Sequence, residues 1–181
     1  MFNLYLLFGI ILISLLFYFF GVNNAKKLKL QNNKLHSLKH YYGFFALLYS
    51  LLPSLGVYFI VTIGDDILFA NMIKSYIPID IINSKDFNFT IALAQINNSV
   101  DGLIFGTPPA WVTNAANIWK SWVIKSHIIT SILCIVTSLI SGYLGYSKIN
   151  HNFRSRNAVE KIVISLLAIS SIIAILTTVG V

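Results

Sequence analysis

Two histidines that stand four residues apart are the first candidates for chemistry in this sequence. On a helix, His36 and His40 would share one face, and with a third ligand they would hold a metal ion. The surrounding residues supply no Cys, Asp or Glu for that third position. We therefore interpret the pair as polar residues of a basic loop, and we predict no metal site and no cofactor.

Other kinds of active site lack their residues as well. His40 and His127 are expected at opposite edges of the membrane, so they cannot ligate one haem iron. Cys134 is the only cysteine and lies in an apolar run, so we predict a packing role and no disulfide. No Walker motif, nucleophile elbow or HExxH motif occurs. We predict no catalytic, cofactor-binding, metal-binding or substrate-binding residue, and the protein is not expected to be an enzyme.

Three polar features have ordinary explanations. Asn-Phe-Thr at 88–90 and Asn-Asn-Ser at 97–99 match the glycosylation triplet, but such triplets are frequent in an Asn-rich chain. Lys120 and Lys125 would attract an anion, but we interpret them as helix-end charges that reach toward water.

The composition identifies a membrane protein. Of 181 residues, 56% are hydrophobic and 10% are charged, whereas a soluble domain carries about 25% charged residues. The net charge of +7 does not indicate nucleic-acid binding, because the basic residues lie in short loops between apolar runs. We predict an all-α, polytopic membrane protein.

Four runs are long enough to span a bilayer, which requires about 20 apolar residues. The predicted spans, none of which contains Lys, Arg, Asp or Glu, are 2–22, 41–64, 126–147 and 162–181. The predicted domains are a membrane hairpin (1–64), an outer helical segment (65–125), the third span with its loop (126–161) and the last span (162–181). The first span lacks a basic region before it and a small-residue cleavage site, so we interpret it as a retained anchor.

The distribution of basic residues predicts the orientation. The two short loops, 23–40 and 148–161, contain Lys26, Lys27, Lys29, Lys34, Lys39, Lys148, Arg154, Arg156 and Lys161, against Glu160 alone. The segment 65–125 contains four lysines and five aspartates, which are Lys74, Lys85, Lys120, Lys125, Asp65, Asp66, Asp80, Asp86 and Asp101. Because positive loops remain cytoplasmic, both short loops are predicted inside, and 65–125 and both chain ends are predicted outside.

Small residues predict where the helices pack. In lipid, helices associate where small residues allow close approach. The expected strips are Gly43, Ala46, Ser50 and Ser54; Ser138, Ser141, Gly142 and Gly145; and Ser170, Ala174 and Thr178. Pro53 should kink the second span.

A helix from about Pro109 is expected to run through Trp119 into the third span. Thr107 would cap this helix, and Pro108 and Pro109 would occupy its first turn. The rest of 65–125 is expected to form short helices on the bilayer surface.

Two stretches resemble the long, N-terminally extended permease subunit of phosphate ABC transporters, the PstC type. The first is "LHSLKHYYGFFALLYSLLPSLG" (35–56), which matches at Leu35, His36, Ser37, Leu38, Tyr41, Tyr42, Gly43 and Pro53, whereas Lys39 replaces the family's usual Pro. The second is "RNAVEKIVISLLAISSIIAILTTVGV" (156–181), which is similar to the start of the permease core and matches at Arg156, Asn157, Val159 and Glu160. The outer segment resembles that family only in length and character.

The resemblance implies a function and partners. The chain would be the N-terminal membrane part of the permease subunit of an ATP-driven phosphate importer in the bacterial inner membrane, and 162–181 would be the first core helix. Its partners would be a PstA-type second permease, cytosolic ATPase subunits, a periplasmic phosphate-binding protein and the lipid bilayer. The alternative is a self-standing four-helix membrane scaffold or assembly protein without transport activity.

The orientation is directly testable. A reporter that is active only in the cytoplasm should be active when inserted beside Lys34 or Arg154, and inactive when inserted within 97–99. An exported reporter at either basic loop would invert the predicted topology.

Overall fold

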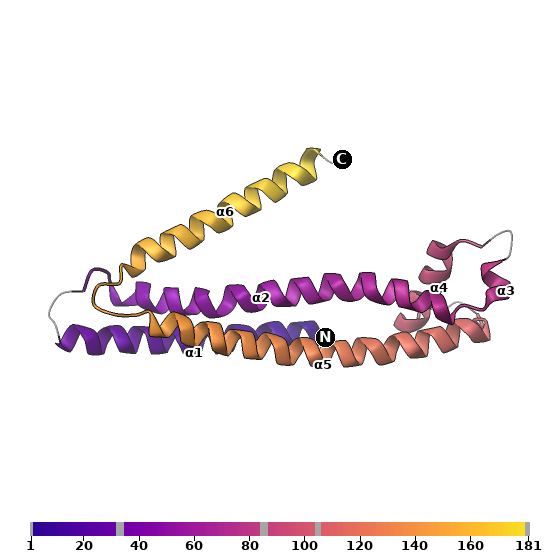
Figure 1. Cartoon of the computed structure of the whole chain (residues 1–181), viewed down its shortest axis with the longest axis horizontal. Coiled ribbons are helices and arrows are strands. Elements are labelled where there is room, and N and C mark those ends of the chain that lie inside the picture. Colours follow the sequence, from indigo (N-terminus) through magenta and orange to yellow (C-terminus); the bar gives the residue numbers. More distant parts are fainter. Residues whose placement is uncertain (1, 32–34, 84–86, 104–105, 180–181) are drawn as a thin grey trace. The chain divides into compact units, whose positions relative to one another are not determined.

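The computed structural model describes residues 2–31, 35–83, 87–103 and 106–179, and within them the secondary-structure elements are all helices. The long helices are α1 (Phe2–Gln31), α2 (Lys39–Met72), α5 (Ala110–Ser147) and α6 (Ser155–Val179). The short helices are η1 (Ile73–Tyr76), α3 (Ile79–Ile82) and α4 (Phe89–Asp101) (Figure 1). Each long helix contains a stretch long and apolar enough to cross a membrane, which confirms the predicted all-α fold with four membrane helices. Lys34, Lys85, Asp86 and Val181 lie outside the described residues.

The chain divides into two compact units. The first unit comprises Met1–Gly56 and Leu133–Val181, and the second comprises Val57–Ile132. The helices α2 and α5 contribute one part to each unit. The predicted domain boundaries at residues 64, 125 and 161 follow the ends of the predicted membrane spans, whereas these two units are defined by contacts within the chain. The predicted boundaries therefore stay a prediction.

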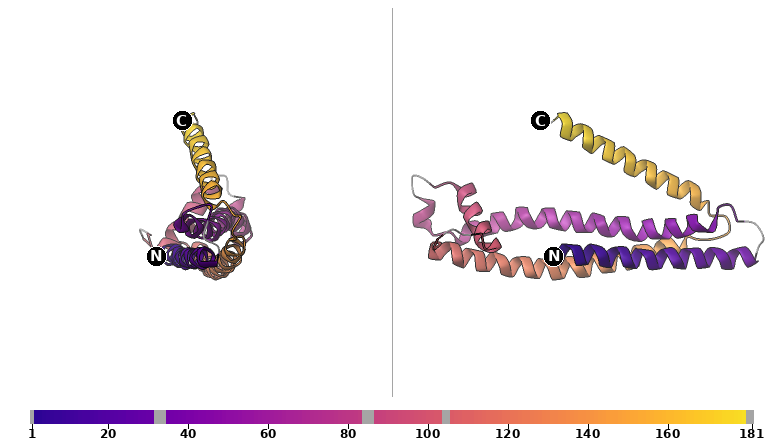
Figure 2. Two further views of the ribbon diagram at one scale, coloured as in Figure 1. Left: turned by 90° about the vertical axis from the view of Figure 1, so that its left-hand side faces the viewer. Right: turned by 180° about the vertical axis from the view of Figure 1, so that it is seen from behind.

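In the first unit, α1, the first part of α2 and the last part of α5 run side by side (Figures 1 and 2). Their directions follow from paired contacts. Ser14 of α1 contacts Ser50 of α2, and Gly21 of α1 lies against Tyr42 of α2. Residue numbers thus increase along α1 where they decrease along α2, so the two helices are antiparallel. Ser50 likewise meets Ser138, and Ser54 meets Cys134, so α2 and α5 are antiparallel.

Small residues form the interior of this bundle, as predicted for the second and third spans. Ser14, Ser50 and Ser138 are almost completely buried. The Ser14 hydroxyl donates to Ile10 O at 2.9 Å and to Ser50 Oγ at 3.3 Å, and the Ser50 and Ser138 hydroxyls lie 2.8 Å apart. Such bonds between membrane helices contribute about 0.6 kcal/mol each on average. The chain of serines therefore joins all three helices while leaving them close enough to pack.

Glycines bring the backbones closer still. At Gly21 an added Cβ would lie 2.7 Å from Tyr42 O and 3.0 Å from Gly43 Cα, and at Gly142 it would lie 2.4 Å from the Phe17 ring. The close contacts of Gly43 and Gly142 confirm these members of the predicted packing strips.

The helices of the first unit extend beyond their apolar spans. The helix α1 continues to Gln31, because Ala25 and Leu28 still pack on the cluster formed with Tyr42. Pro53 lies inside α2, which continues through it as one helix. The Ser54 hydroxyl donates to Ser50 O and Leu51 O nearby. The size of a kink at Pro53 stays a prediction.

The last span, in α6, has no packing partner among the described residues. Every residue from 163 to 179 is exposed, in contrast to Ser155 and Val159 at the start of the helix. The predicted strip of Ser170, Ala174 and Thr178 is therefore uncovered by this chain, and its use as a packing face stays a prediction.

The second unit has an apolar core of its own. Its buried residues are Ile73, Ile96, Val112, Ala115, Ala116 and Trp119, against which Phe69, Trp122 and other apolar side chains pack. The helix α4 starts at a cap in which Asn88 Oδ1 accepts the Thr90 N–H at 2.9 Å, and it ends at Gly102 with φ 73°. The Asn-Phe-Thr triplet thus contains a helix cap. The Ser126 hydroxyl donates to the Asp65 carboxylate and joins α5 to α2 within this unit.

The predicted helix from about Pro109 through Trp119 into the third span is confirmed as α5, but its start differs. The helix begins at Ala110, and Pro109 O accepts the N–H groups of Val112 and Thr113. Pro109 therefore occupies the cap position. The predicted cap at Thr107 and the placement of Pro108 and Pro109 in the first turn were wrong, because the first helical carbonyl is that of Pro109.

Two alanine substitutions on α1 test the close approach. Gly21→Ala should destabilise the bundle by about 1–3 kcal/mol, because the new methyl group meets backbone atoms that cannot rotate away. Gly9→Ala is the matched control, since nothing lies within 4 Å of its Cβ, and it should be neutral or slightly stabilising. Thermal loss of helicity in detergent measures both. Equal melting of the two variants would refute the packing described.

Candidate functional site

The loop between α5 and α6 packs on the end of the three-helix bundle in the first unit. Ile149 belongs to the buried cluster with Ala25, Tyr42 and Ala46, and Phe153 packs against it. The ring centroids of Phe45 and Phe153 are 4.6 Å apart, and the Tyr42 hydroxyl donates to Phe153 O at 3.1 Å. The loop is therefore held by apolar contacts and by a hydrogen bond from α2.

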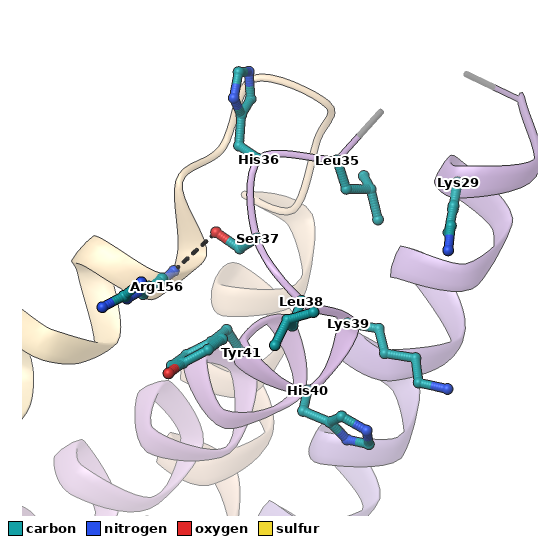
Figure 3. Close-up of a pocket in the computed structure, with 9 residues that line it drawn as sticks. All are labelled: Lys29, Leu35, His36, Ser37, Leu38, Lys39, His40, Tyr41 and Arg156. Atoms are coloured by element: carbon teal, nitrogen blue, oxygen red, sulfur yellow. Dashed lines mark hydrogen bonds between the residues drawn. The ribbon is translucent and has the colours of Figure 1, made fainter. Parts of the chain in front are cut away.

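The segment before α2 reaches the start of α6. Ser37 Oγ accepts the backbone N–H of Arg156 at 3.2 Å, across 119 residues of sequence. The first N–H groups of a helix have no partner within it, so Ser37 acts as a cap supplied from elsewhere in the chain (Figure 3). Arg156 Nε also pairs with Glu160 at 2.6 Å on the exposed side of α6, which supports the same turn.

A basic cleft lies at this junction. It has a volume of about 1020 Å³ and is lined by Lys29 of α1, residues 35–41 and Arg156 of α6. None of these described lining residues is acidic. Figure 3 shows Lys29 and Lys39 on one side of the segment 35–38 and Arg156 on the other. An adjoining hollow of about 430 Å³ adds Arg154, Asn157 and Glu160. We call the larger hollow the junction cleft.

The two candidate metal-binding histidines do not share a helix face. His36 precedes the helix, which begins at Lys39, and Figure 3 shows the His36 and His40 rings pointing to different sides. His40 Nδ1 lies 2.9 Å from the Tyr18 hydroxyl of α1, with the proton on either group. Across the described residues, no group of three His, Cys, Asp or Glu side chains is placed to hold a metal ion.

Other residues considered from the sequence have structural surroundings. Cys134 is fully buried and its thiol donates weakly to Ser54 O at 3.6 Å, which agrees with the predicted packing role. His127 lies in the second unit and His40 in the first, so the exclusion of a shared haem stays a prediction. Lys120 and Lys125 are exposed on α5.

Sequence reasoning missed the residues that build the junction, although a signal was available. Ser37 was noted only as a match to the permease resemblance, and Arg156 only as such a match and as a loop charge. No contact was predicted for Tyr42, and Phe153 was not noted at all. The two resembling stretches, 35–56 and 156–181, turn out to be in contact through Ser37 and Arg156. Lys148 was counted only as a loop charge, but its ammonium group lies 2.6 Å from the Tyr49 hydroxyl and 4.6 Å from the centre of that ring.

The fold defines a class: a helical membrane protein with four helices long and apolar enough to cross a bilayer. Comparison with known proteins narrows the class. Residues 7–177 match the sequence profile of a family described as phosphate ATP-binding cassette transporter, and the chain belongs to this family. No curated protein and no solved structure matches the chain. The family and the four apolar helices therefore indicate a membrane protein associated with phosphate transport.

Removal of the cap at Ser37 should loosen the start of α6. Ser37→Ala leaves the Arg156 N–H without its acceptor, so hydrogen exchange of the amides at 155–158 should accelerate by about three- to tenfold, consistent with a lost hydrogen bond of about 0.5–1.5 kcal/mol. Ser75→Ala is the control, because the Ser75 hydroxyl bonds only locally to Met72 O. Unchanged exchange at 155–158 in Ser37→Ala would show that Ser37 does not cap α6.

Proposed function

We propose that this chain is the N-terminal membrane part of the permease subunit of an ATP-driven phosphate importer, and that it is accessory to the translocation core. The observation that carries the proposal is the contrast within α6. The first turn of this helix is attached to the bundle by Ser37 and by the loop around Phe153, whereas its span from 163 to 179 is uncovered.

This contrast fits a helix that belongs to two assemblies. The bundle of α1, α2 and α5 would fix the basic end of α6, and the apolar span would pack with the other helices of the core. The small strip of Ser170, Ala174 and Thr178 would be the side of closest approach. The family match and the resemblance at 156–181 support the same assignment.

The expected partners follow from the type of importer. They are a PstA-type second permease, cytosolic ATPase subunits that hydrolyse ATP, and a periplasmic phosphate-binding protein. The chain itself would catalyse no reaction. With the basic loops on the cytoplasmic side of the bacterial inner membrane, the second unit would face the periplasm, where its separate apolar core would give the binding protein or the assembly a folded surface.

A second candidate function is a self-standing membrane scaffold. The self-contained bundle of the first unit favours it, because α1, α2 and α5 bury their small residues without help from α6. The coding sequence beyond Val181 distinguishes the two candidates. A permease core in the same reading frame or in a neighbouring gene agrees with the importer, and its absence favours the scaffold.

Co-purification from membranes tests the proposal. The full-length encoded protein is tagged and purified in mild detergent. The wild-type protein should co-purify with the ATPase subunits and the second permease. Ala174→Trp fills the small strip and should reduce this recovery at least fivefold, because a close helix contact cannot accommodate the ring. Ile173→Trp enlarges a neighbouring exposed position on the same helix and should retain recovery.

Three results would contradict the proposal. They are the absence of transporter subunits in the wild-type sample, equal recovery by both tryptophan variants, and unchanged phosphate uptake and assembly after deletion of residues 1–150 from the encoded permease.

A further inference from the structure

We propose that the junction cleft binds the headgroup of an anionic phospholipid. This inference concerns the first unit alone and does not depend on the importer assignment. It rests on three properties of the cleft: the charge of its lining, its exposed apolar residues and its size.

The charge comes from three separate segments. Lys29 is in the last turn of α1, Lys39 begins α2 and Arg156 is in the first turn of α6. All three side chains are exposed, and the described lining residues include no acid to neutralise them. Glu160 occupies Arg156 Nε, which leaves Lys29 and Lys39 as the main cations on their side of the cleft (Figure 3). A negatively charged group is the natural ligand of such a surface.

The apolar residues of the lining favour a lipid over a small soluble anion. Leu35 and Tyr41 are half-buried, and Leu38, which directly precedes Lys39, is 72% exposed. A leucine so exposed beside cations gains nothing from water, but it can contact the glycerol and upper acyl region of a lipid. Long cationic side chains beside an apolar surface are typical of the membrane interface.

The size of the cleft also favours a phospholipid over a small anion. Its volume of about 1020 Å³ is at the upper end of pockets that hold drug-sized ligands, and a phosphate ion would fill only a small part of it. Free phosphate would use only the charge of the lining, whereas a phosphodiester with attached apolar chains would use both the charge and the leucines.

Native mass spectrometry of the whole purified chain, titrated with phosphatidylglycerol or phosphatidylcholine of equal chain length, tests the proposal. Wild type should retain phosphatidylglycerol at least fivefold better than phosphatidylcholine. Lys29→Gln combined with Lys39→Gln should weaken retention of phosphatidylglycerol by roughly tenfold, because each charge near an anionic lipid surface contributes severalfold to affinity. Both lysines are exposed, and circular dichroism verifies that the variant remains folded.

The matched control removes two charges elsewhere. Lys120→Gln combined with Lys125→Gln changes exposed lysines of the second unit and should leave retention unchanged, while Lys29→Arg combined with Lys39→Arg should preserve it. An equal loss in the control pair would show general charge attraction and overturn the site. So would equal retention of the two lipids, or displacement of phosphatidylglycerol by millimolar inorganic phosphate, which would assign the cleft to the free anion.

Discussion

Close approach of helix backbones through small residues is the interaction on which the first unit depends. In hydrocarbon, apolar side chains gain little by leaving lipid for protein, so packing and satisfied polar groups must hold the helices together. Ser14, Ser50 and Ser138 meet this requirement, because each hydroxyl bonds across or along the helices while occupying little volume. Gly21 allows α1 to reach the α2 backbone directly. Larger residues at these positions would separate the helices and remove the hydrogen bonds that the serine hydroxyls make to the neighbouring helix.

The junction at the basic end is a consequence of this packing. Because α1 and α2 are held in register, Tyr42 is placed to receive the loop at Phe153, and Ser37 is placed to cap Arg156. The same contacts restrict only the first turn of α6. A helix attached at one end, with an apolar span beyond, depends on lipid or other helices for the rest of its contacts. The bundle of α1, α2 and α5 therefore packs its own helices, whereas the span of α6 is uncovered by the described residues of this chain.

The sequence predicted the features that depend on local composition. Apolar length alone identifies four spans, and small residues such as Ser50 and Gly142 marked real contacts because close packing has few chemical solutions. Helix ends were harder to predict, since α2 continues beyond the polar Asp65 and Asp66 to pack Phe69 in the second unit. The bond between Ser37 and Arg156 was beyond reach, because nothing local indicates which loops meet across 119 residues. Only the shared resemblance of both stretches to one family gave an indirect signal.

Lys39, which departs from the pattern of the resembling permease, is compatible with the fold. Lys39 stands where the resemblance leads one to expect Pro, and it is the first residue of α2. That position tolerates Pro because its N–H has no partner in the helix and its φ angle is already helical. Lys can adopt the same helical φ angle and also begins the helix, so the backbone accepts either residue at this position. The two residues differ in their side chains, because Lys39 adds a cation to the junction cleft. Because either residue can begin the helix that carries Tyr42, the choice of Lys at position 39 concerns the charge at the edge of the bundle rather than the contact with α6.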